Sequence, residues 1–134
     1  MEATASRAGQ GQRLIRGTLL AESLRPGTSI GGHGMRIVRC SRYEVTGAAA
    51  DQPPVWTAIE FDAPAEEAGA LAQALSEGLL SPGWYVNWTD GDESTIVFPG
   101  TVFRYRRGDL QARAAAQEHG RQCGVPEAQL DWTD

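Results

Sequence analysis

Apolar and polar residues alternate along six short stretches of the chain, and a period of two indicates β-strands with one side facing a core. Three stretches lie in the first half of the chain and three in the second. The expected strands cover residues 14–24, 35–45, 55–61, 84–89, 94–98 and 101–107. The breaker RPGTSIGGHG separates the first two strands and predicts that they form a hairpin with a long loop.

Two further stretches repeat their apolar residues at helical spacing. One covers 65–80, after a helix-start signal at Asp62 and Pro64. The other is Ala-rich and is expected to begin near Asp109, with Gly124 just beyond its last turn. The order βββα-βββα predicts an α+β fold with a mainly antiparallel sheet and two helices. A chain of 134 residues is long enough for one ordinary core, so we expect a single domain.

The start of the chain and its cysteines set the expected compartment. Residues 1–13 are small and polar and lack the apolar stretch of a secretory signal, so we expect a disordered tail at 1–13 and the domain at 14–134. The sequence contains no run of eighteen apolar residues, so we expect no membrane-spanning helix. Cys40 and Cys123 lie far apart, and we expect two reduced thiols in a cytoplasmic protein.

The segment WTDGDESTIVFPG places three carboxylates within residues 90–93, a spacing that could suggest a cation site. Pairing Thr89 with Ser94 instead makes these residues a tight hairpin turn. An EF-hand loop spreads its oxygen ligands over about twelve residues, so we predict a turn and no metal. A Pro-Gly turn after the next strand then sets Glu93 opposite Arg106, which predicts charge pairing across the strands.

The last three expected strands carry apolar residues on both faces of the sheet that they would form. One face holds Tyr85, Ile96, Phe98, Phe103 and Tyr105. The other holds Trp84, Val86, Trp88, Val97 and Val102, with Arg104 and Arg106 at the rim. Two arrangements are open: helices cover both faces, or one face is left for a partner or ligand, since exposed apolar patches usually have a purpose.

Charge is divided along the chain. All twelve basic residues are Arg, and residues 1–46 hold seven of them against three Glu. Residues 51–99 hold nine acidic residues and no Arg. Because the net charge is −5 and no continuous basic stripe is present, nucleic-acid binding is not expected. We expect the basic and acidic segments to neutralise each other within one fold.

Few patterns in the sequence carry chemistry. His119 and Cys123 lie four apart on the second expected helix and would complete a Cys2His2 set with His33 and Cys40, but no CxxC or HxxxH spacing supports zinc. The integrin-type tripeptide at 107–109 is better explained by a helix cap. No nucleophile elbow, HExxH or Walker pattern occurs, so no catalytic residue is assigned and neither a metal nor a cofactor is expected.

The run GWYVNWTDGDESTIVFPGTVFRYRRGD and the later GVPEAQLDW resemble a family of small bacterial proteins, actinobacterial ones among them. The similarity covers nearly everything from Leu14 to Trp132. That family is uncharacterised, so the resemblance implies no activity, cofactor or catalytic residue.

Two functions fit these patterns. The leading hypothesis is a non-enzymatic binding or assembly module whose Trp84/Trp88 face meets a protein partner or a second copy in a homodimer. The alternative is a cofactor-free small enzyme or small-molecule-binding protein, in which aromatic walls and a guanidinium suit an anionic or planar ligand. The residues expected to form this interface or pocket are Trp84, Trp88, Tyr85, Tyr105, Arg104 and Arg106.

Overall fold

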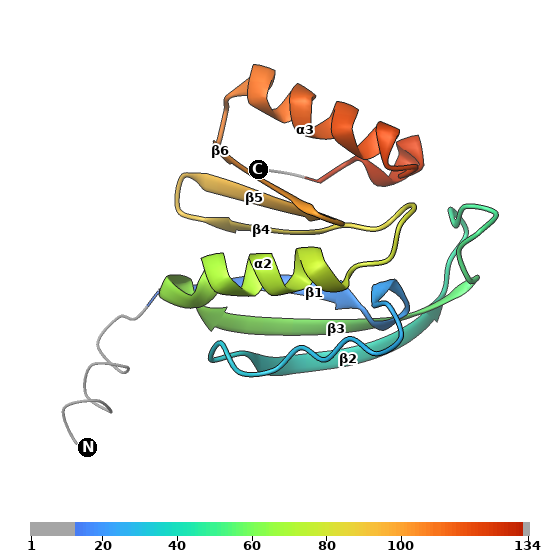
Figure 1. Cartoon of the computed structure of the whole chain (residues 1–134), viewed down its shortest axis with the longest axis horizontal. Helices are drawn as coiled ribbons and strands as arrows, with labels where there is room; N and C mark the ends of the chain where they lie inside the picture. The colour runs from blue at the N-terminus through green and yellow to red at the C-terminus, as the bar shows by residue number, and fades with distance from the viewer. Residues whose placement is uncertain (1–12, 133–134) are drawn as a thin grey trace.

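The computed structural model describes residues 13–132, so the expected tail at 1–13 lies outside the described residues except for Arg13. The strands are β1 (Leu14–Leu20), β2 (Arg36–Glu44), β3 (Val55–Pro64), β4 (Val86–Asp90), β5 (Glu93–Phe98) and β6 (Thr101–Arg106). The helices are α2 (Ala68–Gly78) and α3 (Leu110–Gln122), with short 3-10 turns at Ala21–Ser23, Ala65–Glu67 and Glu127–Gln129. The α+β class and the order βββα-βββα are therefore confirmed (Figure 1).

The strands form two antiparallel sheets of three. The first sheet has the order β1-β3-β2 and the second the order β4-β5-β6. The predicted hairpin between the first two strands is wrong, because β3 lies between them and pairs with both. Asp62 and Glu60 of the central strand β3 bind Arg36 and Arg39 of β2. These ion pairs favour the position of β2 beside β3 at the edge of the sheet. The two halves of the chain thus share an element order but not a strand order.

The second sheet is a middle layer between the two helices. The side chains of one face pack with α2 and those of the other face pack with α3. Helices therefore cover both faces, which is the first of the two arrangements that the sequence leaves open (Figure 1). Trp88 and Trp84 are only 3% and 5% exposed, so the expectation that they form an exposed interface is wrong. Sequence alternation identified this apolar face but not the helix and sheet that bury it.

Helix α2 also covers the inner face of the first sheet. Phe61 of β3 meets the ring of Trp88 edge-on, with ring centroids 6.3 Å apart. Gly17 of β1 makes room for this packing, because a Cβ atom there would lie 2.9 Å from Cζ of Phe61. The main apolar cluster is therefore shared by both sheets and α2.

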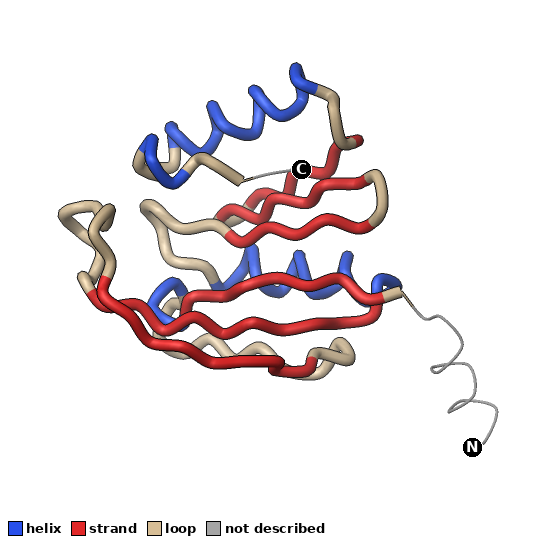
Figure 2. Tube along the Cα trace, turned by 180° about the vertical axis from the view of Figure 1, so that it is seen from behind, coloured by secondary structure: helices blue, strands red, loops and turns tan. Residues whose placement is uncertain are grey.

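The opposite, outer face of the first sheet carries no helix among residues 13–132 (Figure 2). Ion pairs occupy it instead: Asp62 binds Arg36 at 2.8 Å and lies 3.8 Å from Arg16. The hydrogen bond from Arg36 holds the pKa of Asp62 below its ordinary value. The basic segment at the start of the chain is thus neutralised by the acidic segment that follows, as expected. Asp62 is a strand residue, because β3 continues to Pro64, and it does not start the helix.

The predicted ends of α3 are confirmed. The Asp109 side chain accepts a hydrogen bond from the backbone N–H of Ala112 at 3.0 Å and caps α3. Gly124 follows the last turn with a positive φ of 84°, which glycine adopts without strain. Helix α2 begins three residues later than expected, after a 3-10 turn. None of the helices between residues 13 and 132 is long and apolar enough to cross a membrane.

The predicted register of the second sheet is also confirmed. Thr89 pairs with Ser94, and Gly91 turns the chain with a φ of 58°. Glu93 stands opposite Arg106, as the Pro-Gly turn requires. Asp90 of this turn forms an ion pair at 3.2 Å with Arg13, the residue before β1, rather than with an arginine of the neighbouring strand.

Replacing Trp88 by alanine tests the assignment of this residue to the core. We expect Trp88→Ala to lower the free energy of unfolding by about 3–5 kcal/mol, because the change leaves a large cavity between the sheets. The matched control is Ile37→Ala on β2, where the side chain is 63% exposed, and its effect should stay within about 0.5 kcal/mol. Urea denaturation followed by circular dichroism measures both. A Trp88→Ala protein as stable as the wild type would contradict the fold.

Candidate functional site

A hollow with aromatic walls lies where the outer face of the first sheet meets the second sheet. Its volume is about 330 Å³. The side chains that define it are Tyr43, Trp56, Trp84, Tyr85, Asn87 and Asp131, and we call it the aromatic cleft. It lies on the side of the sheets that α3 covers only in part, because α3 packs on the second sheet alone.

Four separate parts of the chain bring these residues together. Tyr43 and Trp56 are a directly opposed pair of β2 and β3. Trp84 and Tyr85 immediately precede β4, which packs beside β1. The rings of Trp56 and Trp84 lie 5.2 Å apart at an interplanar angle of 57°. These two buried indoles therefore form a rigid aromatic corner that joins the two sheets.

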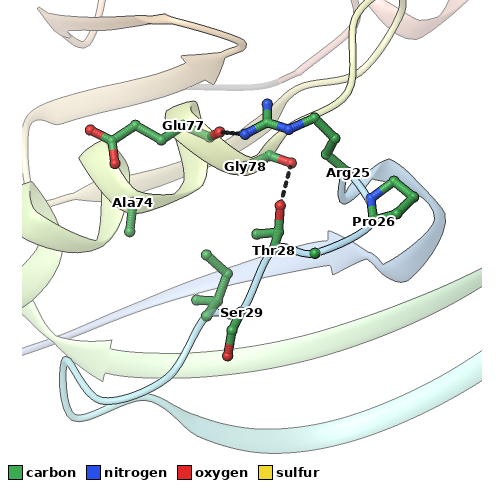
Figure 3. Close-up of a pocket in the computed structure, with 9 residues that line it drawn as sticks. Arg25, Pro26, Thr28, Ser29, Ala74, Glu77 and Gly78 are labelled. Atoms are coloured by element: carbon green, nitrogen blue, oxygen red, sulfur yellow. Dashed lines mark hydrogen bonds between the residues drawn. The ribbon is translucent and has the colours of Figure 1, made fainter.

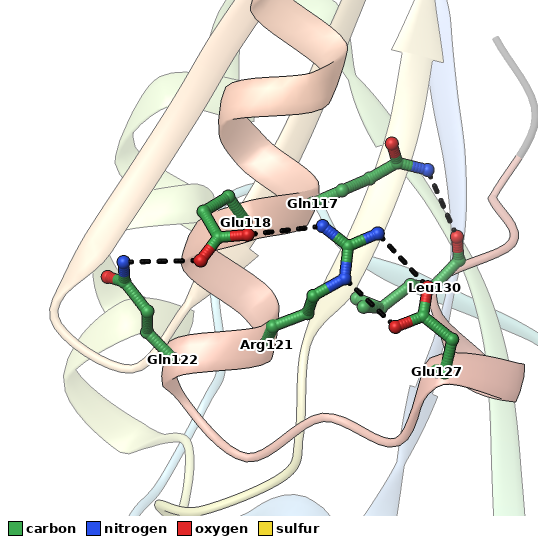
Figure 4. A network of polar contacts seen from close by, with 6 residues as sticks. All are labelled: Gln117, Glu118, Arg121, Gln122, Glu127 and Leu130. Atoms are coloured by element: carbon green, nitrogen blue, oxygen red, sulfur yellow. Dashed lines mark hydrogen bonds and ion pairs between the residues drawn. The ribbon is translucent and has the colours of Figure 1, made fainter.

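The C-terminal segment, residues 125–132, forms the opposite wall. Arg121 of α3 binds both carboxylate oxygens of Glu127 at 2.9 and 3.0 Å, and this contact lowers the pKa of Glu127 (Figure 4). Gln117 donates to the carbonyl oxygen of Leu130 at 3.2 Å. Leu130 and Trp132 are buried. The segment is thus held along α3, which fixes the position of Asp131 between these two residues.

A buried glutamine holds the base of the cleft. Gln52, which is 6% exposed, donates to the carbonyl oxygen of Gly83 at 2.9 Å. Its own oxygen accepts from the backbone of Ala49 and from the side chain of Gln129. Gln129 also donates to the carbonyl oxygen of Gly47 at 2.9 Å. Loop 46–54 and the C-terminal segment are therefore tied to each other next to the aromatic corner.

Some polar groups of the cleft have hydrogen-bond partners within the protein, and others have none among the described residues. The Tyr85 hydroxyl donates to the carbonyl oxygen of Gln129, and burial, with a smaller contribution from Asp131, raises the pKa of Tyr85 to about 12. Thr18 and Asn87 line the cleft, and their side chains find no hydrogen-bond partner within residues 13–132. The carboxylate of Asp131 likewise has no ion-pair partner in that range. These groups are free to contact a molecule in the cleft.

The six residues expected to form one site are divided among three places. Trp84 and Tyr85 lie in the aromatic cleft, and Trp88 is in the core. The remaining three residues, Arg104, Tyr105 and Arg106, line a shallow hollow of about 400 Å³. Acidic residues of the β4–β5 hairpin line the same hollow. The aromatic cleft therefore contains neither arginine, and the hollow beside Arg104 contains no tryptophan. The hollow beside Arg104 lacks the aromatic walls that the sequence predicted for it, since Tyr105 is 7% exposed and its hydroxyl accepts a hydrogen bond from Trp132.

A third hollow, where loop 25–30 crosses the end of α2, has a structural explanation. Arg25 donates to the carbonyl oxygen of Glu77 at 2.6 Å, and Thr28 lies 3.5 Å from that of Gly78 (Figure 3). These carbonyl groups end the helix and have no acceptor role inside it. The loop therefore caps α2.

The histidines and cysteines do not form the Cys2His2 set considered from the sequence. Sγ of Cys123 lies 3.3 Å from Nε2 of His119, and the imidazole packs against Phe98 and Phe103. Burial raises the pKa of Cys123, which keeps it a thiol. Residues 13–132 contain no group of three or more His, Cys, Asp or Glu side chains that could hold a metal ion. The pair is a packed histidine and thiol.

Sequence reasoning missed Tyr43, Trp56 and Asp131. A usable signal existed for the first two, because both lie in strands with period-two patterns. Pairing β2 with β3 would have made them neighbours, but the sequence was interpreted as a hairpin of the first two strands. Asp131 had no local signal, since its place depends on the contacts between α3 and the C-terminal segment.

No protein-family model, curated protein or solved structure matches this chain. The resemblance to small bacterial proteins therefore stays an expectation.

The raised pKa of Tyr85 predicts a loss of stability in alkali. The folded state keeps the phenol proton up to about pH 12, whereas the unfolded state releases it near pH 10. Stability is therefore unaffected below pH 10 and falls by about 2 kcal/mol as the pH rises from 10 to 12. Tyr85→Phe should remove this part of the fall. The exposed Tyr43→Phe should retain it.

Urea denaturation at a series of pH values between 9 and 11.5 measures the effect for all three proteins. The expected outcome is a shallower slope for Tyr85→Phe alone. Equal slopes for the wild type and Tyr85→Phe would show that Tyr85 titrates normally in the folded protein.

Proposed function

We propose that this protein is a non-enzymatic binding module that acts through the outer side of its first sheet, with the aromatic cleft as the recognition site. The observation that carries the proposal is the combination of four aromatic side chains with three unpartnered polar groups around one hollow. Ligand sites are typically apolar hollows with a few convergent polar groups. The cleft has this composition, and the other two hollows do not.

The rigidity of the walls supports a binding role. The Trp56 indole donates to the carbonyl oxygen of Pro53 at 2.9 Å, and its ring rests on Trp84. On the other side, Arg121 and Gln117 hold the C-terminal segment. A ligand entering a hollow that is already ordered loses less free energy to ordering of the protein. The ordered walls therefore favour direct binding of a ligand, without a prior rearrangement that forms the site.

The chemistry of the lining supports binding rather than catalysis. Nucleophilic catalysis requires a nucleophile within hydrogen-bond reach of a base. Among the described residues, the Cys123–His119 pair has this spacing, but it lies outside the cleft lining and its thiol has a raised pKa. A small cofactor-free enzyme is accordingly the weaker proposal.

A cytoplasmic location in a bacterial cell belongs to the same proposal. Both cysteines are free thiols, and Cys40 is exposed on β2. Exposed free thiols persist in a reducing compartment. The bacterial origin rests on the resemblance of the segment from Gly83 to Asp109.

Removal of one aromatic wall tests the cleft. In a screen of small aromatic and aliphatic compounds by ligand-observed NMR, we expect hits that compete with one another for one site. Tyr43→Ala should weaken these hits about 3- to 10-fold, because it removes an exposed ring from the wall. Ile37→Ala, on the same strand but outside the lining, should leave them unchanged. Hits that bind equally to both variants, or the absence of hits, would contradict the proposal.

Self-association along β2 is the second candidate, and it retains the assembly role considered from the sequence. Three of the five large hydrophobic side chains that are most exposed lie on this edge strand: Ile37 at 63%, Tyr43 at 45% and Val38 at 41%. An edge strand with unpaired backbone groups can pair with another chain. The irregular register between Ile37 and Arg39 and the arginines of β2 weaken this candidate, since bulges and charges are features that block edge pairing.

Light scattering as a function of concentration tests this candidate. It predicts a dimer for the wild type and a monomer for Ile37→Asp. The control Leu110→Asp, at a 75% exposed position on α3, should keep the dimer. A monomeric wild type at millimolar concentration would eliminate self-association and leave the cleft unaffected.

A further inference from the structure

We propose that the aromatic cleft binds an organic cation, of the quaternary ammonium or substituted amine class. This inference rests on the proposed function and specifies its ligand. The first observation is the charge of the cleft lining. The lining contains one ionised group, the carboxylate of Asp131, and no arginine, although every basic residue of the chain is an arginine. An anion in the cleft would therefore meet a negative charge and no compensating positive one.

Four arginines of β1 and β2 already bind acidic or hydroxyl side chains. Arg39 binds Glu60 at 2.8 Å on the outer face, and Arg16 and Arg36 share Asp62. Arg42 binds Thr57 at 2.6 Å and reaches Glu22. None of these side chains lines the cleft. The carboxylate of Asp131 is thus left as the charge that a ligand would meet there.

The second observation is the set of aromatic rings that line the cleft. An aromatic face carries negative charge density, so ammonium groups bind against tryptophan and tyrosine rings with about 0.5–2 kcal/mol per contact. Tyr43 is 45% exposed at the mouth, and the Trp56–Trp84 corner lies behind it. Tyr85 completes the wall as a neutral phenol whose hydroxyl is already engaged with Gln129. Several rings and one carboxylate around a hollow match a methylated ammonium better than they match a neutral or anionic group.

The size of the cleft limits the ligand. About 330 Å³ lies at the lower end of the range for small-molecule sites, which is roughly 300–1,000 Å³. A trimethylammonium group with a short chain fits this volume. Asn87 and Thr18 offer an amide and a hydroxyl to polar atoms on such a chain.

Three probes of nearly the same shape separate charge from shape. Choline carries the cation, 3,3-dimethylbutan-1-ol replaces its nitrogen by carbon, and 3,3-dimethylbutanoate carries an anion. Titrations of the full-length chain followed by tryptophan fluorescence or calorimetry give the three dissociation constants. We expect choline to bind about 10-fold more tightly than the neutral alcohol, and the anion not to bind measurably.

The Asp131→Asn variant tests the carboxylate. It should weaken choline about 5-fold or more while leaving the alcohol unchanged, because only the charged probe interacts with the lost charge. Asp51→Asn removes a carboxylate from the exposed loop 46–54 outside the lining and should change neither. Urea denaturation establishes that both variants are folded.

The outcomes separate this inference from the function on which it rests. If the alcohol and choline bind equally, or the anion binds best, the cleft is a binding site but its ligand is not a cation. If none of the probes binds and no compound competes in the wider screen, the proposed function itself fails. Binding of choline that Asp131→Asn does not weaken would place the cation elsewhere on the protein and overturn the inference.

Discussion

The strand β5 sets the constraint on which the rest of the structure depends, because five of its six residues are buried. Both faces of the second sheet are therefore apolar and must be covered. Leaving either face in water would cost about 1.5–3 kcal/mol for each large side chain, which exceeds what a domain of this size can sustain. Helices α2 and α3 accordingly take one face each, and Trp88 is enclosed instead of presented to a partner.

The placement of both helices on the second sheet leaves the first sheet with one covered face. Its inner face shares α2, whereas its outer face meets water. The ion pairs of Asp62 and Glu60 with arginines make that face compatible with solvent. Aromatic residues remain at one end of the face, where Trp56 packs on Trp84. The aromatic cleft is the place where the uncovered sheet, the start of β4 and the C-terminal segment meet.

Local signals explain why the second half of the chain could be predicted from its sequence. Tight turns at Gly91 and Gly100 fix the register of β4, β5 and β6, so each residue could be assigned to a face. Asp109 and Gly124 marked the ends of α3 for reasons of backbone geometry. The long connections on either side of β2 impose no register, and the order of the first sheet depends on contacts between distant residues. That is why the predicted hairpin was wrong.

The same reasoning explains the limited success at the site. Alternation predicts one face for Trp84 and Trp88 and the other for Tyr85. Trp84 and Tyr85 instead precede β4 and line the cleft, whereas Trp88 lies within the strand and in the core. Tyr43 and Asp131 are separated by most of the chain and meet through strand pairing and the clamp of Arg121 on Glu127. Composition indicated aromatic residues and arginines, and it could not show that Arg104 and Arg106 would line a different hollow from Trp84 and Tyr85.

The most direct test of this account is a ¹H–¹⁵N spectrum of the tryptophan indole groups recorded while choline is added. The account predicts saturable shifts for the indoles of Trp56 and Trp84, which form the corner of the cleft. The indole of Trp88, enclosed between the sheets and α2, should stay in place and serves as an internal control. Shifts confined to Trp88, or no change at any indole up to high choline concentration, would contradict the assignment of the cleft as the binding site.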